Sequence, residues 1–171
     1  FFTLYETGIA VSNAAYHATR TLAEQLGGRA HPHIPLKELA YLSGLAAPGD
    51  NTLALVGEWG SRVCLTAIAF NRSLNPIRPP APPACLHCGA CRRACPTGAL
   101  GSGGVDRSRC LSAATLSPGI QPAWLQPLFQ GRVHGCDLCQ AACPLNGQPQ
   151  PVPEEIATLF APERLVFAPD R

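Results

Sequence analysis

The sequence predicts an α+β fold, in which a small N-terminal part of helices and a β-hairpin precedes a loop-rich unit built around clustered cysteines. Three observations support this prediction. Helical periodicity and then short apolar runs occupy the first part of the 171 residues. Seven of the nine cysteines follow in two tight runs. The 16 glycines and 18 prolines predict many turns and loops.

The first predicted helix runs to Leu26, with Ser12 or Asn13 as its N-cap and Gly27 as its stop signal. Its apolar positions follow a period of 3.6 residues: Ala15, Ala18, Leu22 and Leu26. Pro35 suits the first turn of a second helix. We expect its inward face to consist of Leu36, Leu39, Ala40 and Leu42.

Two strands are predicted next, residues 52–56 and 62–70, which form a hairpin around the turn 57–60. Cys64 lies in the second of them. Because free cysteine behaves as a small apolar residue, we expect Cys64 in the core and not among metal ligands.

Prolines divide the rest of the chain. Residues 1–75 form the N-terminal part, and 76–84 are a stiff Pro-rich connector. Residues 85–146 are the cysteine-rich unit, which we expect to contain a short helix within 122–129. Residues 147–171 are a C-terminal extension with another helix at 153–160.

Both cysteine runs carry the spacing of bacterial ferredoxins. The first run, Cys85–Pro96, reads CLHCGACRRACP and matches C-x2-C-x2-C-x3-C-P. The second run, Cys136–Pro144, reads CDLCQAACP and has Val133 where the first cysteine of the pattern would stand. Cys110 is the candidate that replaces it. The sequence therefore predicts a bacterial-ferredoxin-like double-cluster unit with two [4Fe–4S] clusters.

In such a unit the last cysteine of each run ligates the other cluster. This rule assigns Cys85, Cys88, Cys91 and Cys143 to cluster one, and Cys95, Cys110, Cys136 and Cys139 to cluster two. Disulfides and two zinc sites are the alternatives. The x3-C-P ending, which occurs twice, favours iron and sulfur.

Titratable and charged residues near the cysteines are not expected to be cluster ligands. His87 lies inside the first run, where we expect it to face solvent or to support the ligands, because the loop already supplies thiolates. Four arginines flank the cysteines and could dock an acidic redox partner or remain solvated: Arg92, Arg93, Arg107 and Arg109.

Composition excludes some classes of protein. A net charge of +2 is too balanced for a nucleic-acid-binding or membrane-surface protein. The longest strongly apolar run, residues 64–70, is too short to span a membrane. No secretory signal is visible, so we expect a cytoplasmic protein. The sequence contains no Met and starts at Phe1, so we expect a trimmed chain or a fragment.

The order of segments resembles that of the epoxyqueuosine reductases and, more distantly, the reductive dehalogenases. AYHATRTLAEQL, LKELAYLSGLAAPGDNTLAL and GSRVCLTAIAF precede CPTGAL, RCLSAATLSPGI and GCDLCQAACPLN, so the resemblance runs from about Tyr16 to Asn146. It implies that residues 1–75 are the remnant of that family's α/β domain. It also implies two [4Fe–4S] clusters, a cobalamin and reduction of a modified tRNA nucleoside.

The chain departs from the family's pattern at the positions that carry chemistry. Pro32 stands where the family's acid would be, and no carboxylate occurs between Glu24 and Glu38. Ala15 replaces an aspartate; Ala47 and Asp50 replace a Trp and a Lys. We therefore assign no catalytic and no cobalamin-binding residues.

The leading hypothesis is an electron-transfer protein or subunit with two [4Fe–4S] clusters, which works with a redox partner protein within a complex. The alternative is a cobalamin-dependent reductase of the epoxyqueuosine reductase or reductive dehalogenase type, completed by further residues or a partner chain. Its substrate would then be tRNA or a small electrophile. A third hypothesis gives the clusters only a structural role.

Overall fold

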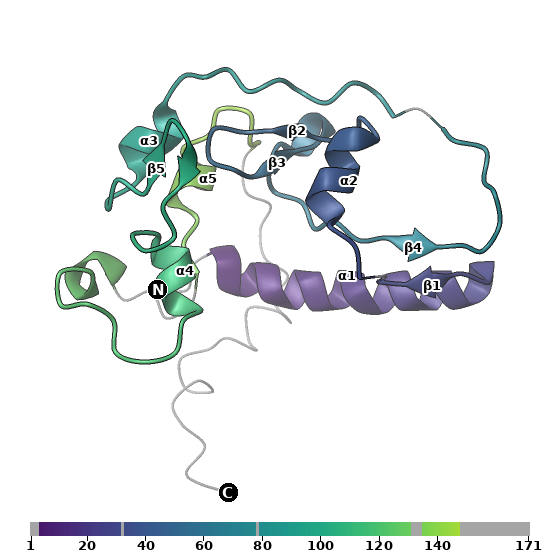
Figure 1. Ribbon diagram of the computed structural model, residues 1–171, viewed down its shortest axis with the longest axis horizontal. Helices are drawn as coiled ribbons and strands as arrows, with labels where there is room; N and C mark the ends of the chain where they lie inside the picture. The colour runs from purple at the N-terminus through teal and green to yellow at the C-terminus, as the bar shows by residue number, and fades with distance from the viewer. Residues whose placement is uncertain (1–3, 32, 78, 131–134, 148–171) are drawn as a thin grey trace, which may run out of the picture.

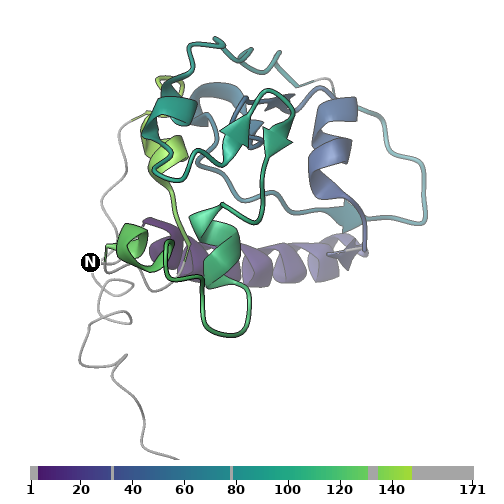
Figure 2. The ribbon, with the colours of Figure 1, turned by 60° about the vertical axis from the view of Figure 1, so that its left-hand side comes forward.

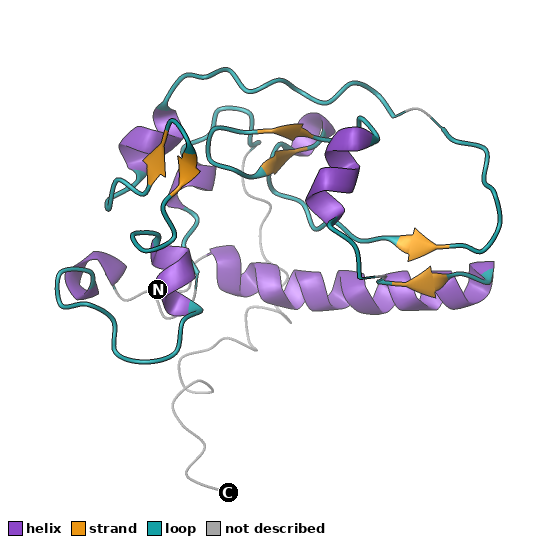
Figure 3. Ribbon diagram, viewed as in Figure 1, coloured by secondary structure: helices purple, strands orange, loops and turns teal. Residues whose placement is uncertain are grey.

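The computed structural model describes residues 4–31, 33–77, 79–130 and 135–147, and only the backbone of 4–12 (Figure 1). The long helix α1 (Leu4–Leu26) runs along one side of the molecule. The other elements are β1 (Arg29–Ala30), α2 (Leu36–Leu42), β2 (Ala47–Pro48), β3 (Ala54–Leu55), η1 (Gly57–Trp59), β4 (Ile68–Ala69), α3 (Ala90–Ala94), β5 (Leu100–Gly101), β6 (Gly104–Val105), α4 (Leu111–Thr115), η2 (Gln126–Phe129) and α5 (Leu138–Ala141). Helices and small sheets thus mix as an α+β fold, and the short helices α3 and α5 lie together (Figures 2 and 3).

The described strands form three antiparallel pairs: β1 with β4, β2 with β3, and β5 with β6. The predicted hairpin between residues 52–56 and 62–70 is therefore wrong. Its first strand shortens to β3, which pairs with the preceding β2, and its second shortens to β4, which pairs with β1. The short helix η1 and the bridge between Val56 and Gly60 occupy the intervening turn, so the chain leaves it without returning along β3.

The first helix begins at Leu4, so the predicted N-cap at Ser12 or Asn13 is wrong. Among the side chains described for this helix, the small Ala23 is buried, at 2% exposure, whereas Leu22 and Leu26 are both 47% exposed. Strand β4 lies close to the residues that follow the helix, since a Cβ on Gly28 would overlap the Ile68 side chain and lie 3.1 Å from the Ala69 carbonyl oxygen.

The second helix begins after Pro35, as predicted, but its inward face differs. Ala40 is buried, whereas Leu39 and Leu42 are exposed, at 41% and 84%. Ala40 packs in a small core with Ala46, Ala54 and Val56. Small side chains let the helix approach β2 and β3 closely, so the larger leucines remain outside. This core holds the loop between β2 and β3 in place.

A second small core supports the later cysteines. Leu111, Ala114 and Leu125 are buried there, and η2 and Cys136 pack against them. Residues 123–125 form turns before the four-residue η2, so the helix predicted within 122–129 is limited to its second half. The predicted helix at 153–160 lies outside the described residues.

Cys64 is exposed and lies outside any strand, which contradicts its predicted place in the core. The reason is that β4 begins only at Ile68, so no sheet turns Cys64 inward. Between β4 and α3 the chain runs as an extended segment with many prolines (Figure 1). No helix in the described part of the chain has the length and apolar character needed to cross a membrane.

Candidate iron–sulfur site

The first cysteine run forms a tight loop that ends in α3. His87 and Gly89 have positive φ angles of 49° and 70°, which turn the backbone twice within the loop. The Arg93 guanidinium donates a hydrogen bond to the carbonyl oxygen of Cys88 at 3.0 Å. These features bring the cysteines of the loop toward one side.

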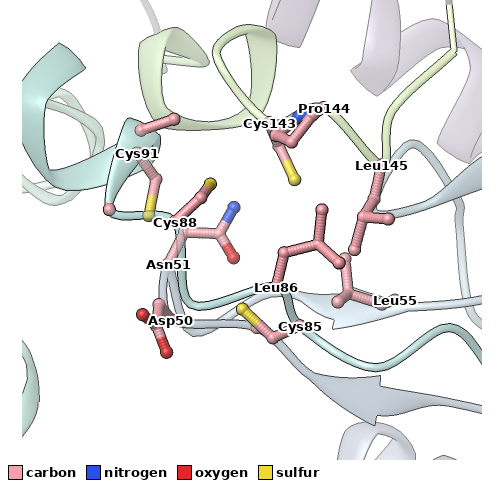
Figure 4. Close-up of a pocket in the computed structure, with 13 residues that line it drawn as sticks. Asp50, Asn51, Leu55, Cys85, Leu86, Cys88, Cys91, Cys143, Pro144 and Leu145 are labelled. Carbon is pink, nitrogen blue, oxygen red and sulfur yellow. The ribbon is translucent and has the colours of Figure 1, made fainter.

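A pocket that is partly open to solvent lies against this loop. Four cysteines line it: Cys85, Cys88, Cys91 and Cys143. Cys143 comes from the second run, and Figure 4 shows its sulfur directed toward the same space as that of Cys88. Leu55, Leu86 and Leu145 supply apolar walls. The structure thus gathers in one pocket the four cysteines that the crossing rule groups together.

The second cysteine group consists of Cys95, Cys110, Cys136 and Cys139. Burial, and after it the charges of Cys136, Cys110, Cys95 and Cys91, raise the pKa of Cys139 to about 12. Charges act in this way only from nearby, so these sulfurs lie near that of Cys139. Cys136 packs on the second small core, and Cys110 stands at the N-terminus of α4.

Cys95 has two hydrogen-bond contacts within its own loop. The backbone N–H of Ala99 donates to its sulfur at 3.3 Å, and the Thr97 hydroxyl lies 3.4 Å from it. Burial raises the pKa of Cys95, but these hydrogen bonds outweigh burial and leave the pKa below its usual value. The donors favour negative charge on this sulfur.

The loop between β2 and β3 reaches the four-cysteine pocket from the N-terminal part. Asp50 accepts a hydrogen bond or ion pair from His87 at 2.8 Å and lies 3.5 Å from the Arg92 guanidinium. The ligand atoms of Asp50, Cys85 and His87 all lie within 4.8 Å of one another. Burial, followed by smaller effects that include the charge of Asp50, raises the pKa of Cys91.

Asn51, next in this loop, is 5% exposed and also lines the pocket. The sequence pattern indicates Asp50 only as a replacement and gives Asn51 no role. The turn residues Gly49, Asp50 and Asn51 between two apolar stretches were the available signal, but they specify a turn and not what the turn touches.

A hydrogen-bond network joins the second run to the N-terminal part. The Asn146 side chain accepts from the Ser61 N–H at 2.7 Å and donates to the Ser61 hydroxyl at 3.0 Å and to the Gln140 carbonyl oxygen. The Gln140 amide donates to the Ser61 carbonyl at 2.6 Å. Gly60 has no room for a Cβ, because Asn146 and Leu145 press against it.

The other residues singled out in the sequence have different surroundings. His87 is largely solvent-facing, with 76% of its side chain exposed, as expected. Arg109 donates to the Thr97 carbonyl at 2.8 Å, and Arg107 is exposed. His31, beside Pro32, stacks on Tyr16 with ring centroids 3.7 Å apart. Pro32 itself and Val133 lie outside the described residues.

The residues present fit two iron–sulfur clusters. Four thiols line one partly apolar pocket, and Cys139 lies near enough to Cys136, Cys110 and Cys95 for their charges to act on it. The amide nitrogen of Asn51 is buried at the first pocket with no hydrogen-bond partner among the described residues. A buried unpartnered donor costs about 1–3 kcal/mol, a cost that an acceptor in the pocket removes.

Comparisons with known proteins agree with this chemistry. Residues 84–146 match the 4Fe-4S double cluster binding domain, which confirms the predicted cofactors. The epoxyqueuosine reductase of Alicycliphilus denitrificans is 37% identical over 147 residues, 76% of this chain and 40% of the relative. That of Escherichia coli is 37% identical over 136 residues, 78% of this chain and 35% of the relative. The chain therefore spans about two fifths or less of these relatives.

Solved structures agree as well. A selenomethionine-labelled epoxyqueuosine reductase superposes with a TM-score of 0.63 at 28% identity, over 80% of this chain and 38% of that one. An epoxyqueuosine reductase with a tRNA-Tyr epoxyqueuosine-modified stem loop gives 0.63 at 29% identity, with the same shares covered. The resemblance seen in the sequence is thus confirmed: the chain is a homologue of part of the epoxyqueuosine reductases and contains a 4Fe-4S double cluster binding domain.

Proposed function

We propose that this chain is the iron–sulfur part of a reductase of the epoxyqueuosine reductase type. Its cysteine-rich unit, residues 85–146, is ferredoxin-like and follows an N-terminal part (1–75) and a connector (76–84), with a C-terminal extension (147–171). The observation that carries the proposal is the pocket that Cys143 shares with three cysteines of the first run. This crossed arrangement is typical of proteins with two neighbouring clusters.

We assign the eight ligands by this crossing. Cluster one takes Cys85, Cys88, Cys91 and Cys143; cluster two takes Cys95, Cys110, Cys136 and Cys139. When bound, the clusters accept and pass on single electrons. The chain's own groups hold the thiolates, exclude part of the solvent with Leu55, Leu86 and Leu145, and place charges and donors beside the sulfurs.

The sequence alone favours a separate electron-transfer subunit over a reductase. The comparisons support the reductase alternative better, because the relatives and solved structures reported above are all epoxyqueuosine reductases. In this proposal the chain's part in the reaction is still electron relay. A redox partner protein supplies the electrons. The substrate class that the structural neighbour supports is a tRNA stem loop.

We assign no residues to a cobalamin. The described pocket is lined by thiols and apolar side chains, which suit a cluster, so we place no corrinoid in it. The enzyme's reaction also requires a proton donor at the substrate. The chain spans 35–40% of its relatives, so we expect that reaction only from a longer protein or a complex.

Iron content and cysteine variants test the ligand assignment. Anaerobically reconstituted chain should contain about eight irons. Cys110→Ser should lower this to about four, whereas Cys64→Ser, which changes the remaining cysteine, should leave both clusters. Iron analysis with EPR of the reduced protein provides the readout. A Cys110→Ser variant with two unchanged clusters would contradict the assignment.

Cobalamin titration and a tRNA assay test the enzymatic part. With cobalamin present, we expect a strong reductant to reduce the clusters of this chain. By itself the chain should not convert epoxyqueuosine in tRNA. The same assay should show conversion once the remaining parts of the enzyme are supplied. A longer protein with both clusters but no conversion under these conditions would refute the reductase assignment.

A further inference from the structure

Asn51 presents a buried hydrogen-bond donor to the four-cysteine pocket. Its side chain is 5% exposed, and its amide nitrogen has no partner in the described ranges. The amide oxygen accepts from the backbone N–H of Leu53 at 3.2 Å. Because this contact fixes which end is oxygen, the nitrogen must face the other way. Figure 4 shows the amide projecting into the space near the sulfurs of Cys88 and Cys143.

The loop around Asn51 is built closely about this side chain. A Cβ on Gly49 would lie 2.6 Å from the amide oxygen of Asn51, so only glycine leaves room for it. Thr52 has a φ of 64°, an unfavourable angle for a β-branched residue. Hydrogen bonds hold this turn: Gly49 to Leu53, Thr52 to Gly49, and Lys37 to the Thr52 carbonyl at 2.7 Å. Strain retained at a turn beside a pocket indicates a role for the residue that it positions.

We propose that the Asn51 side-chain N–H donates a hydrogen bond to a sulfur of cluster one and thereby raises the reduction potential of that cluster. The inference rests on the ligand assignment proposed above. One-electron reduction takes the cluster from the 2+ to the 1+ core, so the unit with four thiolates changes from a charge of −2 to −3. A donor stabilises the more negative state, and hydrogen bonds to sulfur are one of the means by which proteins tune these potentials.

Asp50, in the same turn, should have the opposite effect on the reduction potential of cluster one. Its carboxylate oxygen lies within 4.8 Å of the Cys85 sulfur. A negative charge so near disfavours the added electron, even with His87 and Arg92 beside it. Removal of the Asn51 donor should therefore lower the potential of cluster one, whereas removal of the Asp50 charge should raise it. A purely structural role for the loop would not produce opposite signs.

The test is an EPR-monitored redox titration of the full chain, reconstituted anaerobically and reduced with dithionite. Asn51→Leu keeps a similar volume without a donor. We expect its equilibrium constant for reduction of one cluster to fall on the order of tenfold, which is about 59 mV for a one-electron couple. The other cluster should keep its potential. Asn75→Asp, at an exposed position, is the control and should change neither.

Asn51→Asp keeps the acceptor for Leu53 and replaces the donor with an anion, so it tests the inference even if Asn51→Leu does not fold. It should lower the same potential at least as much. ENDOR of the reduced wild-type protein should also show an exchangeable proton coupled to the cluster that both variants lack. Two clusters with unchanged potentials and proton couplings in Asn51→Asp would overturn the inference. A wild-type chain without iron would instead overturn the proposed function on which it rests.

Discussion

The four-cysteine pocket and the second cysteine group differ in what surrounds them. The pocket is shared between two parts of the chain, because Asp50, Asn51 and Leu55 line it together with the cysteines. The second group is supported from within the cysteine-rich unit, by Thr97, Ala99 and the small core around Leu111. Two sites with the same ligands can thus have different electronic environments, and the N-terminal part acts on one of them.

The connection between the two parts depends most on Asn146. In Asn146→Ala, the N–H and hydroxyl of Ser61 lose a partly buried partner, and Gln140 loses a contact as well. We expect a loss of about 1–3 kcal/mol in the free energy of unfolding, typical of buried groups left without partners. Denaturant unfolding of the reconstituted chain measures it. Asn75→Ala, at an exposed position, should be neutral.

The same variant distinguishes the two sites. Because Asn146 holds the N-terminal part against the second run, cluster one should lose iron to a chelator faster in Asn146→Ala, with cluster two less affected. Equal acceleration at both clusters would show that the N-terminal part does not protect one site selectively.

The charge of Asp50 gives the next effect in size. Asp50→Asn should raise the equilibrium constant for reduction of cluster one on the order of tenfold, because a carboxylate near the Cys85 sulfur disfavours the reduced state. Redox titration by EPR measures this shift. Glu38→Gln removes an exposed charge on α2 and should leave both potentials unchanged. A shift in cluster two with none in cluster one would contradict the placement of Asp50.

Thr97 gives the smallest effect. Thr97→Val removes a hydroxyl 3.4 Å from the Cys95 sulfur but leaves the Ala99 N–H in place. We expect a few-fold lower equilibrium constant for reduction of cluster two, because hydrogen bonds to sulfur favour the reduced state. Thr115→Val, which alters a hydroxyl that accepts from Gly135 and not one at a sulfur, is the comparison. A shift confined to cluster one would contradict the assignment of Cys95.

Local spacing is the part of the sequence that carries most of the information about the candidate site. Three cysteines of the first run and Cys143 were grouped from their spacing alone, and the structure places the same four around one pocket. The separation of successive cysteines limits how a loop can turn, so this information is contained within short segments. The prediction that Cys110 is the fourth ligand of cluster two depends on the same argument. The Cys110→Ser variant tests it.

Long-range pairing was the part that the sequence could not specify. Residues 62–70 were expected to pair with their neighbours, yet β4 pairs with β1 across the intervening α2 and β3. The inward face predicted for α2 was wrong because close approach to β2 and β3 favoured Ala40 over the larger leucines. Asn51 was missed for the same reason: its place beside the cysteines arises from contacts between segments far apart in the chain.

The crossed assignment of Cys143 is the central claim, and one measurement tests it directly. EPR-monitored titration of Cys143→Ser, with Asp50→Asn as the marker of cluster one, shows which cluster this cysteine serves. We predict that the signal whose potential responds to Asp50→Asn is altered or lost in Cys143→Ser, while the other signal persists. Loss of the signal that does not respond to Asp50→Asn would contradict the account.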